Sequence, residues 1–483
     1  MLRPHLVALI LLISTLSSQA ETGNEQDINL PNIGDSTGTL ISPIQEQQLG
    51  RAFMRSVRQQ TSISQDPEIR DYIDAIGKRL GSVSDSPTYP FHFFIVMNPA
   101  INAFAGPGGY IGVHSGLILA TESESELASV IAHEIAHVTQ RHLYQAFEDS
   151  KRLSLPTAAA TLAALLIGSQ SPEAGQAAIM AIQAGSVQHQ INFTRDNEKE
   201  ADSIGMQTLA RSNYDPHSMP LFFEKLQQSS RFYGKGPPEF LRTHPVTSAR
   251  IADTRSRSEK YGYRQVTDSI DYLLVKAKLL VLSDKNSRNT IKLFKKRLTR
   301  GTSEQKDVAQ YGLALAFHKN EEFSNAIPLF RKLVEKNPQQ PHYVTALAAA
   351  LFEGGEHKKS LATYKSAIEH FPALLSIRQS YGEALLRSGQ AKKAQQQFLV
   401  IDRYILTSPE LYRLIARTYK LTGEAAQSHR HLAESYYLNG RINEAIRQLT
   451  LAQKAAKNDF YLLTQIEERL DLFLKIRKMM RKG

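Results

Sequence analysis

Hydrophobic positions follow two patterns along this chain, and the change between them falls near residue 270. Before that point, helical spacing over 46–60 and 67–81 predicts amphipathic helices, and the dense apolar run FHFFIVM at 91–97 predicts a buried strand. After it, only the helical pattern remains. The predicted fold is therefore α+β and mostly helical, with a small sheet confined to the first half.

The second half repeats itself with a period of 34 residues. Aromatic residues and glycines recur in register under that shift: Phe330, Tyr364 and Phe398, and Gly355, Gly389 and Gly423. This is the period of the tetratricopeptide repeat, a helix–turn–helix unit that buries its apolar face by stacking on its neighbours. The 34-residue register holds for four units and slips near Leu432. A degraded helix pair at 270–300 precedes these units. We expect 270–483 to form an all-α tetratricopeptide solenoid that docks a substrate or partner.

The run TESESELASVIAHEIAHVTQRH (121–142) predicts a helix. Ser123 is its predicted N-cap, and Glu126, three residues on, completes a capping box. No Gly or Pro interrupts the run before His142. We therefore expect one continuous helix across it.

This helix carries the pentapeptide HEIAH, from His133 to His137. Residues four apart share a helix face, so His133 and His137 have the spacing that one metal ion requires. Glu134 follows the first histidine and can reach a metal-bound water without binding the metal. This is the zincin arrangement, in which two imidazoles hold zinc and the carboxylate is the general base.

A second predicted helix, RDNEKEADSIGMQTLARS (195–212), supplies candidates for the remaining ligand. A catalytic zinc has three protein ligands and one open position. Glu198 and Asp202 share one face, whereas Glu200 lies on another, because two residues turn a helix by about 200°. We assign Glu198 as third ligand and Asp202 as an acid that supports a ligand imidazole or the proton transfer. An ordinary solvated acidic face is the alternative.

Four motifs in order carry a resemblance: NAFAGPGGYIGVHSGLI (102–118), HEIAH (133–137), EKEAD (198–202) and THPVTSARI (243–251). Together they resemble the zinc peptidases typified by the CAAX prenyl endopeptidase and the heat-shock membrane protease HtpX. In that family HExxH is followed by ExxxD, and the resemblance implies the same two roles for Glu198 and Asp202. It implies a zincin-type metalloprotease domain over 45–260. This chain departs from the integral-membrane members in one respect, because no transmembrane helices are expected around this core.

Within this domain, 101–105 and 110–118 flank Gly-Pro-Gly-Gly, whose turn chemistry predicts a β-hairpin. In zincins an edge strand beside the metal helix pairs with extended substrate through its main chain. The candidate edge strand here is Asn102, Ala103, Phe104 and Ala105. A purely structural hairpin is the other interpretation, and the two are compatible.

The segment 153–186 between the two metal-binding helices is apolar and rich in Ala, but its run of thirteen residues over 155–167 is too short to span a bilayer. Two interpretations stay open: helices packed against the core, which we favour, and a mobile lid over the cleft.

His244 lies in the sequence Arg242-Thr243-His244-Pro245. The resemblance implies that this loop is near the active site. Two roles stay open for it. As imidazolium it would stabilise the transition-state oxyanion; as a neutral ligand it would take the open position of the zinc and hold the enzyme latent. Arg250 is expected to support this loop through a salt bridge.

Residues 1–20 have the features of a signal peptide: Arg3, an apolar centre over 6–13 and the small-x-small site SQA at 18–20. The polar segment 21–44 that follows is expected to be flexible. The chain contains no Cys, so neither disulfides nor a lipid-modified cysteine is available. We expect export to the periplasm with cleavage of the signal peptide.

The chain is basic, with 58 Lys+Arg against 47 Asp+Glu. Solvated helix faces explain most of this excess, and the rest suits an acidic partner or a peripheral contact with an anionic membrane surface. Nucleic acid is not expected as a partner, because the chain is exported and carries no recognition motif.

These features predict an exported zinc endopeptidase with one Zn²⁺ per chain. The resemblance extends to periplasmic members that serve outer-membrane β-barrel assembly. It implies misassembled outer-membrane proteins as substrates and the β-barrel assembly machinery as partner. The main alternative is a tetratricopeptide chaperone or adaptor with a latent or structural zinc centre. A hydrolase of cell-wall peptides is disfavoured, because the sequence carries no wall-binding module. The physiological substrate and the oligomeric state stay open.

Overall fold

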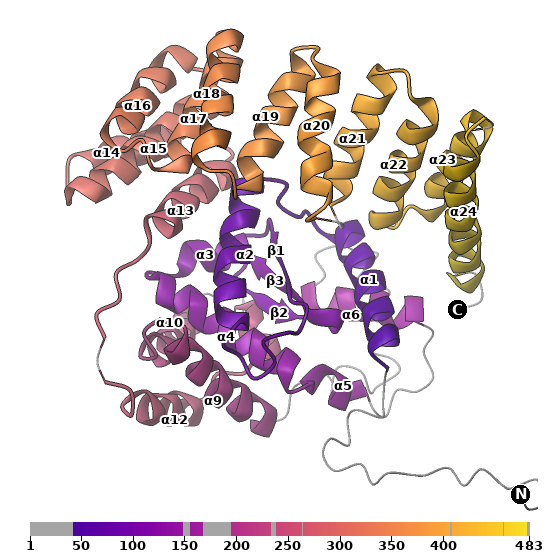
Figure 1. The fold of residues 1–483 in the computed structure, drawn as a ribbon. Coiled ribbons are helices and arrows are strands. Elements are labelled where there is room, and N and C mark those ends of the chain that lie inside the picture. The colour runs from indigo at the N-terminus through magenta and orange to yellow at the C-terminus, as the bar shows by residue number, and fades with distance from the viewer. Residues whose placement is uncertain are drawn as a thin grey trace, which may run out of the picture.

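The computed structural model describes the chain in seven segments: 42–147, 155–167, 195–232, 238–262, 264–405, 408–456 and 458–480. Figure 1 shows an arc of paired helices lying over a first half that holds the sheet. The predicted signal peptide, nearly all of 21–44 and the second part of 153–186 lie outside the described residues. Within the described segments, no helix has the length and apolar character needed to cross a bilayer.

Helices α1 (Pro43–Gln60) and α2 (Pro67–Gly81) begin the described chain and confirm the two helices expected there. Ser42 and Asp66 accept hydrogen bonds from the free N–H groups of the first turns. Each helix also has Pro at its first position, where the missing N–H removes no helical bond. Capping residues visible in the sequence therefore fix where both helices start.

The sheet has three strands in the order β1-β3-β2. β1 (His92–Val96) runs parallel to β3 (Tyr110–His114), and β2 (Ala103–Ala105) is antiparallel to β3. A 3₁₀ turn at Pro107–Gly109 joins β2 to β3, and Gly108 has φ 70°, which favours glycine. The predicted hairpin is thus confirmed, and β2 lies at an edge of the sheet.

The second arm of the hairpin is shorter than the apolar run 110–118 predicted. β3 ends at His114, and helix α3 (Ser115–Ala120) follows at once. The Asn98 carbonyl accepts hydrogen bonds from the Ser115 hydroxyl at 3.0 Å and the Gly116 N–H at 2.9 Å. These bonds turn the chain out of the sheet at that point.

Helix α4 (Glu124–Thr139) carries HEIAH and is capped by Ser123, as predicted. The capping box is wrong in its second half, because the Glu126 carboxylate accepts from the Glu122 N–H at 2.7 Å. The continuous helix to His142 is also wrong, since α4 ends at Thr139.

Arg141 causes this break. It adopts φ 57°, in the left-handed region that few residues other than glycine enter, and α5 (His142–Phe147) then starts in a new direction. The Arg141 guanidinium lies over the Tyr144 ring at 5.0 Å and pairs with Glu46 at 3.4 Å. These contacts stabilise a turn that the sequence does not announce with Gly or Asn.

Helix α9 (Arg195–Arg211) packs directly on α4. At Gly205 a Cβ atom would lie 3.1 Å from the backbone of His133, so glycine permits the close approach of the two helices. Helix α6 (Leu155–Ile167) packs against α1, with Leu162 buried beside Phe53. This described part of 153–186 is therefore a packed helix.

Three short helices complete the first half: α10 (Ser218–Phe232), α11 (Glu239–Thr243) and α12 (Ser248–Ser258). Helix α13 (Ile270–Ser283) then belongs to both halves. One of its faces, with Tyr272, Val275 and Leu279, enters the first-half core. The other, with Leu274, Ala277 and Val281, enters the solenoid core. The two units consequently share a helix.

The remaining helices form the solenoid: α14 (Ser287–Leu298), α15 (Ser303–Lys319), α16 (Phe323–Lys336), α17 (Pro341–Glu353), α18 (His357–His370), α19 (Leu375–Arg387), α20 (Ala391–Asp402), α21 (Pro409–Leu421), α22 (Ala425–Leu438), α23 (Ile442–Ala455) and α24 (Phe460–Met480). The 34-residue glycines Gly355, Gly389 and Gly423 lie in turns with φ of 85°, 75° and 85°. They close the two helices of each repeat, as the periodicity predicted.

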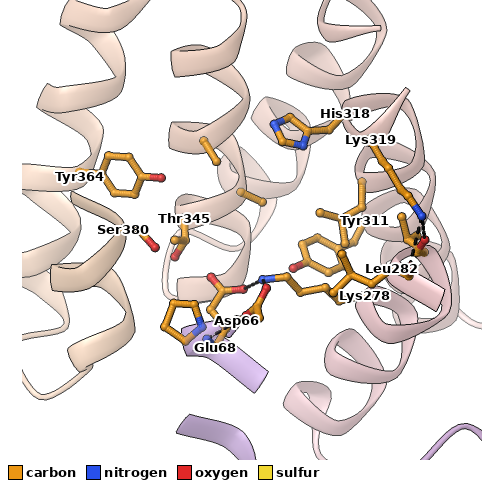
Figure 2. Close-up of a pocket in the computed structure, with 15 residues that line it drawn as sticks. Asp66, Glu68, Lys278, Leu282, Tyr311, His318, Lys319, Thr345, Tyr364 and Ser380 are labelled. Carbon is orange, nitrogen blue, oxygen red and sulfur yellow. Dashed lines mark hydrogen bonds and ion pairs between the residues drawn. The ribbon is translucent and has the colours of Figure 1, made fainter. Parts of the chain in front are cut away.

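The N-terminal end of α2 meets the solenoid at four residues that we call the interdomain cluster: Asp66, Glu68, Lys278 and His342. Lys278 Nζ lies 2.6 Å from an Asp66 oxygen and 2.7 Å from a Glu68 oxygen. His342 Nδ1 lies 3.3 Å from Glu68. Figure 2 shows Lys278 reaching both carboxylates at the edge of a cavity of about 260 Å³.

Candidate metal centre

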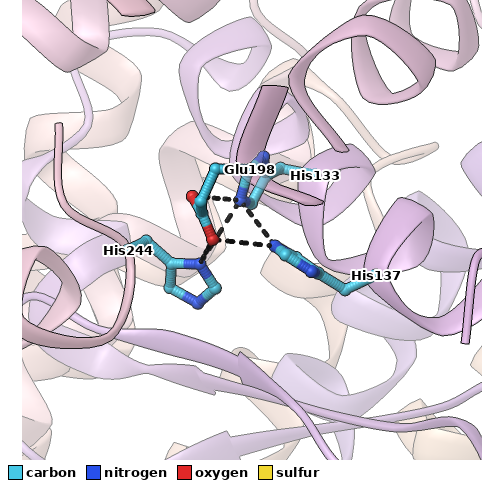
Figure 3. Close-up of side chains that lie close together, drawn as sticks. All are labelled: His133, His137, Glu198 and His244. Atoms are coloured by element: carbon cyan, nitrogen blue, oxygen red, sulfur yellow. Dashed lines mark hydrogen bonds and ion pairs between the residues drawn. The ribbon is translucent and has the colours of Figure 1, made fainter. Parts of the chain in front are cut away.

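Four buried side chains from three segments meet at one point in the first half (Figure 3). His133 and His137 come from α4, Glu198 from α9, and His244 from the residue after α11. Each offers one ligand atom, and these atoms all lie within 4.8 Å of one another. The structure thus brings together the three predicted ligands and the predicted loop histidine.

The spacing of these atoms fits a tetrahedral ion. His133 Nε2 lies 3.0 Å from His137 Nε2 and 3.6 Å from Glu198 Oε2, and His137 Nε2 lies 3.4 Å from Glu198 Oε1. Ligand atoms about 2.0–2.2 Å from a tetrahedral zinc are about 3.3–3.6 Å apart. Imidazole nitrogens with one carboxylate are also a donor set of catalytic zinc, so the residues present fit this metal.

The local electrostatics favour a positive charge here. Burial by itself lowers the pKa of His133, but Asp202 and Glu198 raise it to about 9. Burial likewise opposes charge on Glu198, yet His244 and the two other histidines hold the pKa of that carboxyl well below its usual range. Without a metal, the carboxylates draw a proton to His133. A bound cation would supply the same charge.

His133 is supported from behind by a buried ion pair. Its Nδ1 lies 3.0 Å from Asp202 Oδ1, on the same helix as Glu198. Arg250 of α12 in turn binds Asp202 through two nitrogens, at 2.8 and 2.7 Å. Asp202 therefore lies where its predicted role as a supporting acid requires.

Arg250 connects three parts of the site. It also pairs with Glu198 at 2.6 Å and donates to the Pro245 carbonyl at 2.9 Å. The sequence predicted a salt bridge through which Arg250 supports the 242–246 loop. The structure shows a hydrogen bond to the loop and salt bridges to Asp202 and Glu198 instead.

Two residues next to His137 were missed in the sequence. His142 Nδ1 lies 2.9 Å from His137 Nδ1, and His142 Nε2 lies 3.1 Å from Glu200 Oε2. On a continuous helix His142 would point away from His137, and Glu200 was placed on a face away from the metal. Only the break at Arg141 brings these groups together.

Glu134 is fully buried beside the four ligand residues. Burial raises the pKa of its carboxyl, and His244 and His133 oppose that rise. Its Oε1 lies 3.6 Å from His244 Nε2, and among the described residues neither carboxylate oxygen has a side-chain hydrogen-bond partner. Glu134 thus has free acceptor capacity at the metal centre.

His244 is held in place by its backbone and its ring. Its N–H donates to the Phe240 carbonyl at 2.8 Å, and its ring stacks on Phe240 with centroids 4.9 Å apart. Its Nδ1 lies 2.8 Å from Glu198 Oε1 and 3.5 Å from His133 Nε2. This nitrogen occupies the fourth corner of the ligand cluster.

The candidate edge strand lies next to this centre. β2 contacts α4, and the Ala105 backbone influences the pKa of Glu134. Asn102 Nδ2 donates to the Leu166 carbonyl of α6 at 3.3 Å, and Ala103 to Ala105 are all buried. β2 is therefore an edge strand near the candidate general base, with α6 beside it.

Models of two known protein families match part of each half of the chain. Residues 67–258 match the model of peptidase family M48, a zinc-dependent family, and residues 308–339 match that of the tetratricopeptide repeat. The matches fall on the two units that the fold separates.

Relatives extend the match to the whole length. The chain is 33% identical over 476 residues to the beta-barrel assembly-enhancing protease of Escherichia coli (strain K12), covering 97% of this chain and 96% of that one. It is 28% identical over 180 residues to the mitochondrial metalloendopeptidase OMA1 of Schizosaccharomyces pombe, covering 37% of this chain and 50% of that one. Among solved structures, the tetratricopeptide protein YrrB matches 38% of this chain and 93% of its own, with 16% identity and a TM-score of 0.29.

Proposed function

The chain belongs to the beta-barrel assembly-enhancing protease family, within peptidase family M48, and from this we propose that it degrades misassembled outer-membrane proteins and assists the assembly of others. It is a zinc-dependent metalloendopeptidase. The chaperone-only alternative is not favoured, because the relatives that span the whole chain are named proteases. Export to the periplasm through a cleaved signal peptide at 1–20 forms part of the proposal.

The observation that carries the proposal is the convergence of the ligand atoms of His133, His137 and Glu198 beside the free acceptor oxygens of Glu134. When bound, zinc lowers the pKa of its water and polarises the scissile carbonyl. Glu134 would be the general base that takes a proton from the attacking water and the general acid that returns it to the leaving amine.

Substrate binding divides between the two halves in this proposal. β2, with Asn102–Ala105, pairs with an extended segment through main-chain hydrogen bonds, which lets the enzyme accept many sequences. The solenoid docks the client or the assembly machinery. Because α13 joins both cores, the docking surface and the catalytic site are held at a fixed distance.

His244 acts as a latch in this proposal. The support is that His244 Nδ1 completes a set of four ligand atoms, which is the composition of a closed zinc site rather than an open one. Release requires only that substrate or partner pulls the 242–246 loop away from the centre. The competing role, stabilising the oxyanion as imidazolium, makes the opposite forecast for a substitution.

The test is digestion of an unfolded outer-membrane β-barrel protein by the full mature chain, with wild type beside Glu134→Gln. The amide preserves size and cannot accept the proton, so hydrolysis is expected to fall about 10²–10⁴-fold while zinc content and fold are unchanged. Equal proteolysis by the two proteins would rule out the mechanism. If the chain digested unfolded casein but no β-barrel protein, the protease activity would stand and the proposed substrate class would be rejected.

A further inference from the structure

The two histidines of HEIAH have different supports behind them. His133 is backed by Asp202 and Arg250, both buried. His137 is backed by His142, which is buried, and by Glu200, whose side chain is 51% exposed. His142 and Glu200, the members of this second chain of contacts, are neither proposed zinc ligands nor the proposed general base.

The chain runs from solvent to the metal centre through two imidazoles. Glu200 Oε2 lies 3.1 Å from His142 Nε2, and His142 Nδ1 lies 2.9 Å from His137 Nδ1. The Nε2 atom of His137 then faces His133 and Glu198 at the metal centre. Both nitrogens of both rings are thus engaged in order.

Donor and acceptor chemistry fixes the direction of these bonds. An ionised carboxylate only accepts, so the proton of the neutral His142 ring belongs on Nε2, facing Glu200. His142 Nδ1 is then an acceptor, and His137 must donate to it from Nδ1. The lone pair of His137 is therefore on Nε2, where it points at the metal centre.

The reverse direction is incompatible with metal binding. If His142 donated from Nδ1, His137 would carry its proton on Nε2, directed at His133 Nε2 only 3.0 Å away. A protonated nitrogen cannot bind a metal ion. A carboxylate at the position of Glu200 selects the metal-binding arrangement.

We propose that His142 and Glu200 are positioning residues that hold His137 in the tautomer and orientation that bind zinc. The inference rests on the proposed function, because it takes His137 as a zinc ligand. Neither residue touches the ligand atoms, and both act through the far nitrogen of His137.

The backbone around His142 supports this assignment. Arg141 adopts φ 57°, and strained backbone of this kind is tolerated where surrounding contacts hold it. Its contacts with Glu46 and Tyr144 provide that hold. The turn reverses the chain directly after α4, and so returns His142 to the side of His137.

The experiment measures zinc affinity of the full mature chain by competition with a chromophoric chelator. Four single variants are compared with wild type: His142→Ala, His142→Asn, Glu200→Ala and Asp196→Ala. Removing a group that orients a ligand histidine costs about 10–100-fold in metal affinity, which is the expected loss for His142→Ala. Glu200→Ala is expected to weaken binding in the same direction by less, because water can replace its exposed carboxylate.

The other two variants separate positioning from packing. In His142→Asn the amide oxygen lies near the former Nδ1 and can accept from His137, so most of the affinity should return. Asp196→Ala removes a carboxylate from the exposed surface of the same helix, and should bind zinc like wild type. The absorption spectrum of the Co²⁺-substituted proteins should shift in His142→Ala and return toward wild type in His142→Asn.

Wild-type affinity in both His142→Ala and Glu200→Ala would overturn the inference, as would an Asn variant as weak as the Ala variant. If wild type itself bound no zinc, the proposed function would fail instead. Should His142→Ala not fold, Glu200→Ala still decides, because its side chain is half exposed and carries no core packing.

Discussion

The metal centre and the interdomain cluster are two buried groups of charged residues made from the same side-chain types. Each combines carboxylates with histidine and one long basic residue, and each joins segments far apart in the chain. They differ in how the charges within each cluster are balanced, and in whether the ligand atoms of several side chains converge on one point.

In the interdomain cluster the protein supplies every partner. Lys278 lies between Asp66 and Glu68, and Glu68 also reaches His342. Burial opposes the charge on Lys278, yet the two carboxylates hold its pKa well above the usual value. Two carboxylates are thus matched by one ammonium and one imidazole, and no further cation is needed.

In the metal centre, charge balance needs either a proton on a histidine or a bound cation. Glu134, Glu198 and Asp202 are all buried, and Arg250 is the guanidinium that pairs with two of them. The ring nitrogens of His133 and His137 meet at 3.0 Å. Converging imidazole nitrogens therefore distinguish the candidate metal site from the interdomain cluster, whereas burial and charge alone do not.

The largest expected effect concerns metal retention. Glu198→Gln removes one ligand, so zinc content should fall from one per chain to a small fraction, and His137→Ala should do the same. Removing zinc with a chelator should lower the stability of the wild-type protein. If free zinc was at 100 times its Kd before chelation, the loss is about 2.7 kcal/mol, whereas the stability of Glu198→Gln should not change. Zinc analysis and thermal unfolding with and without chelator check both. Glu68→Gln is the control that must keep its zinc. If Glu198→Gln kept a full zinc content, Glu198 would not be a ligand, and the assignment of one cluster as the metal site and the other as structural would be wrong.

The next effect tests the balanced cluster. Lys278→Met leaves the buried Glu68 and the partly buried Asp66 without their cation, which should destabilise the protein by about 3–5 kcal/mol in urea unfolding. Zinc content should not change. Adding Glu68→Gln to Lys278→Met should restore part of the stability, because one uncompensated charge disappears. A double variant less stable than Lys278→Met would contradict this account of the cluster.

Much of the fold was predictable because the signals were local. Apolar periodicity gave α1, α2 and β1, turn glycines gave the hairpin, and the 34-residue period gave the solenoid. HEIAH and the Glu198–Asp202 spacing located the candidate ligands, because helix geometry alone places residues four apart on one face.

The missed features depend on tertiary contacts. Arg141 carries no sequence signal for a left-handed turn, so the end of α4 and the return of His142 could not be foreseen. Arg250 was seen only as a support for the loop, because its pairing with Asp202 and Glu198 requires the packing of α12 on α9. The shared helix α13 was hidden for the same reason, since helical periodicity does not say which core each face enters.

A smaller effect is expected from His244→Ala. If the latched form predominates and about 10% of molecules are open at rest, removing the latch raises basal casein hydrolysis about tenfold while zinc stays bound. If His244 instead stabilises the oxyanion, activity should fall about 10²–10³-fold. Casein hydrolysis and zinc content of this variant decide between them, and lower activity with full zinc would end the latch hypothesis. His342→Gln is the matched comparison, because it removes an imidazole from the interdomain cluster and leaves the metal centre intact.

The smallest expected effect is the pH dependence of the interdomain cluster, which arises from His342. Burial lowers the pKa of this histidine, but Glu68 outweighs burial and raises it above 6.5. Asp271 and Lys278 are the other charged groups that face it, and the Asp66 carboxylate and Tyr311 hydroxyl lie near Lys278.

Because the folded pKa of His342 is raised, its stabilisation is fully present below the unfolded value, about 6.5. That stabilisation is lost as the pH rises through the folded pKa. The pKa of Glu68 is depressed, so its contribution has the opposite sign and is lost only in acid, below about pH 4.5. We therefore expect the urea midpoint of the zinc-loaded protein to fall from about pH 6 to pH 8, and His342→Gln to flatten this slope. An equally steep slope in His342→Gln would assign the titration to other groups, and would leave the interdomain cluster as a pH-independent ion pair.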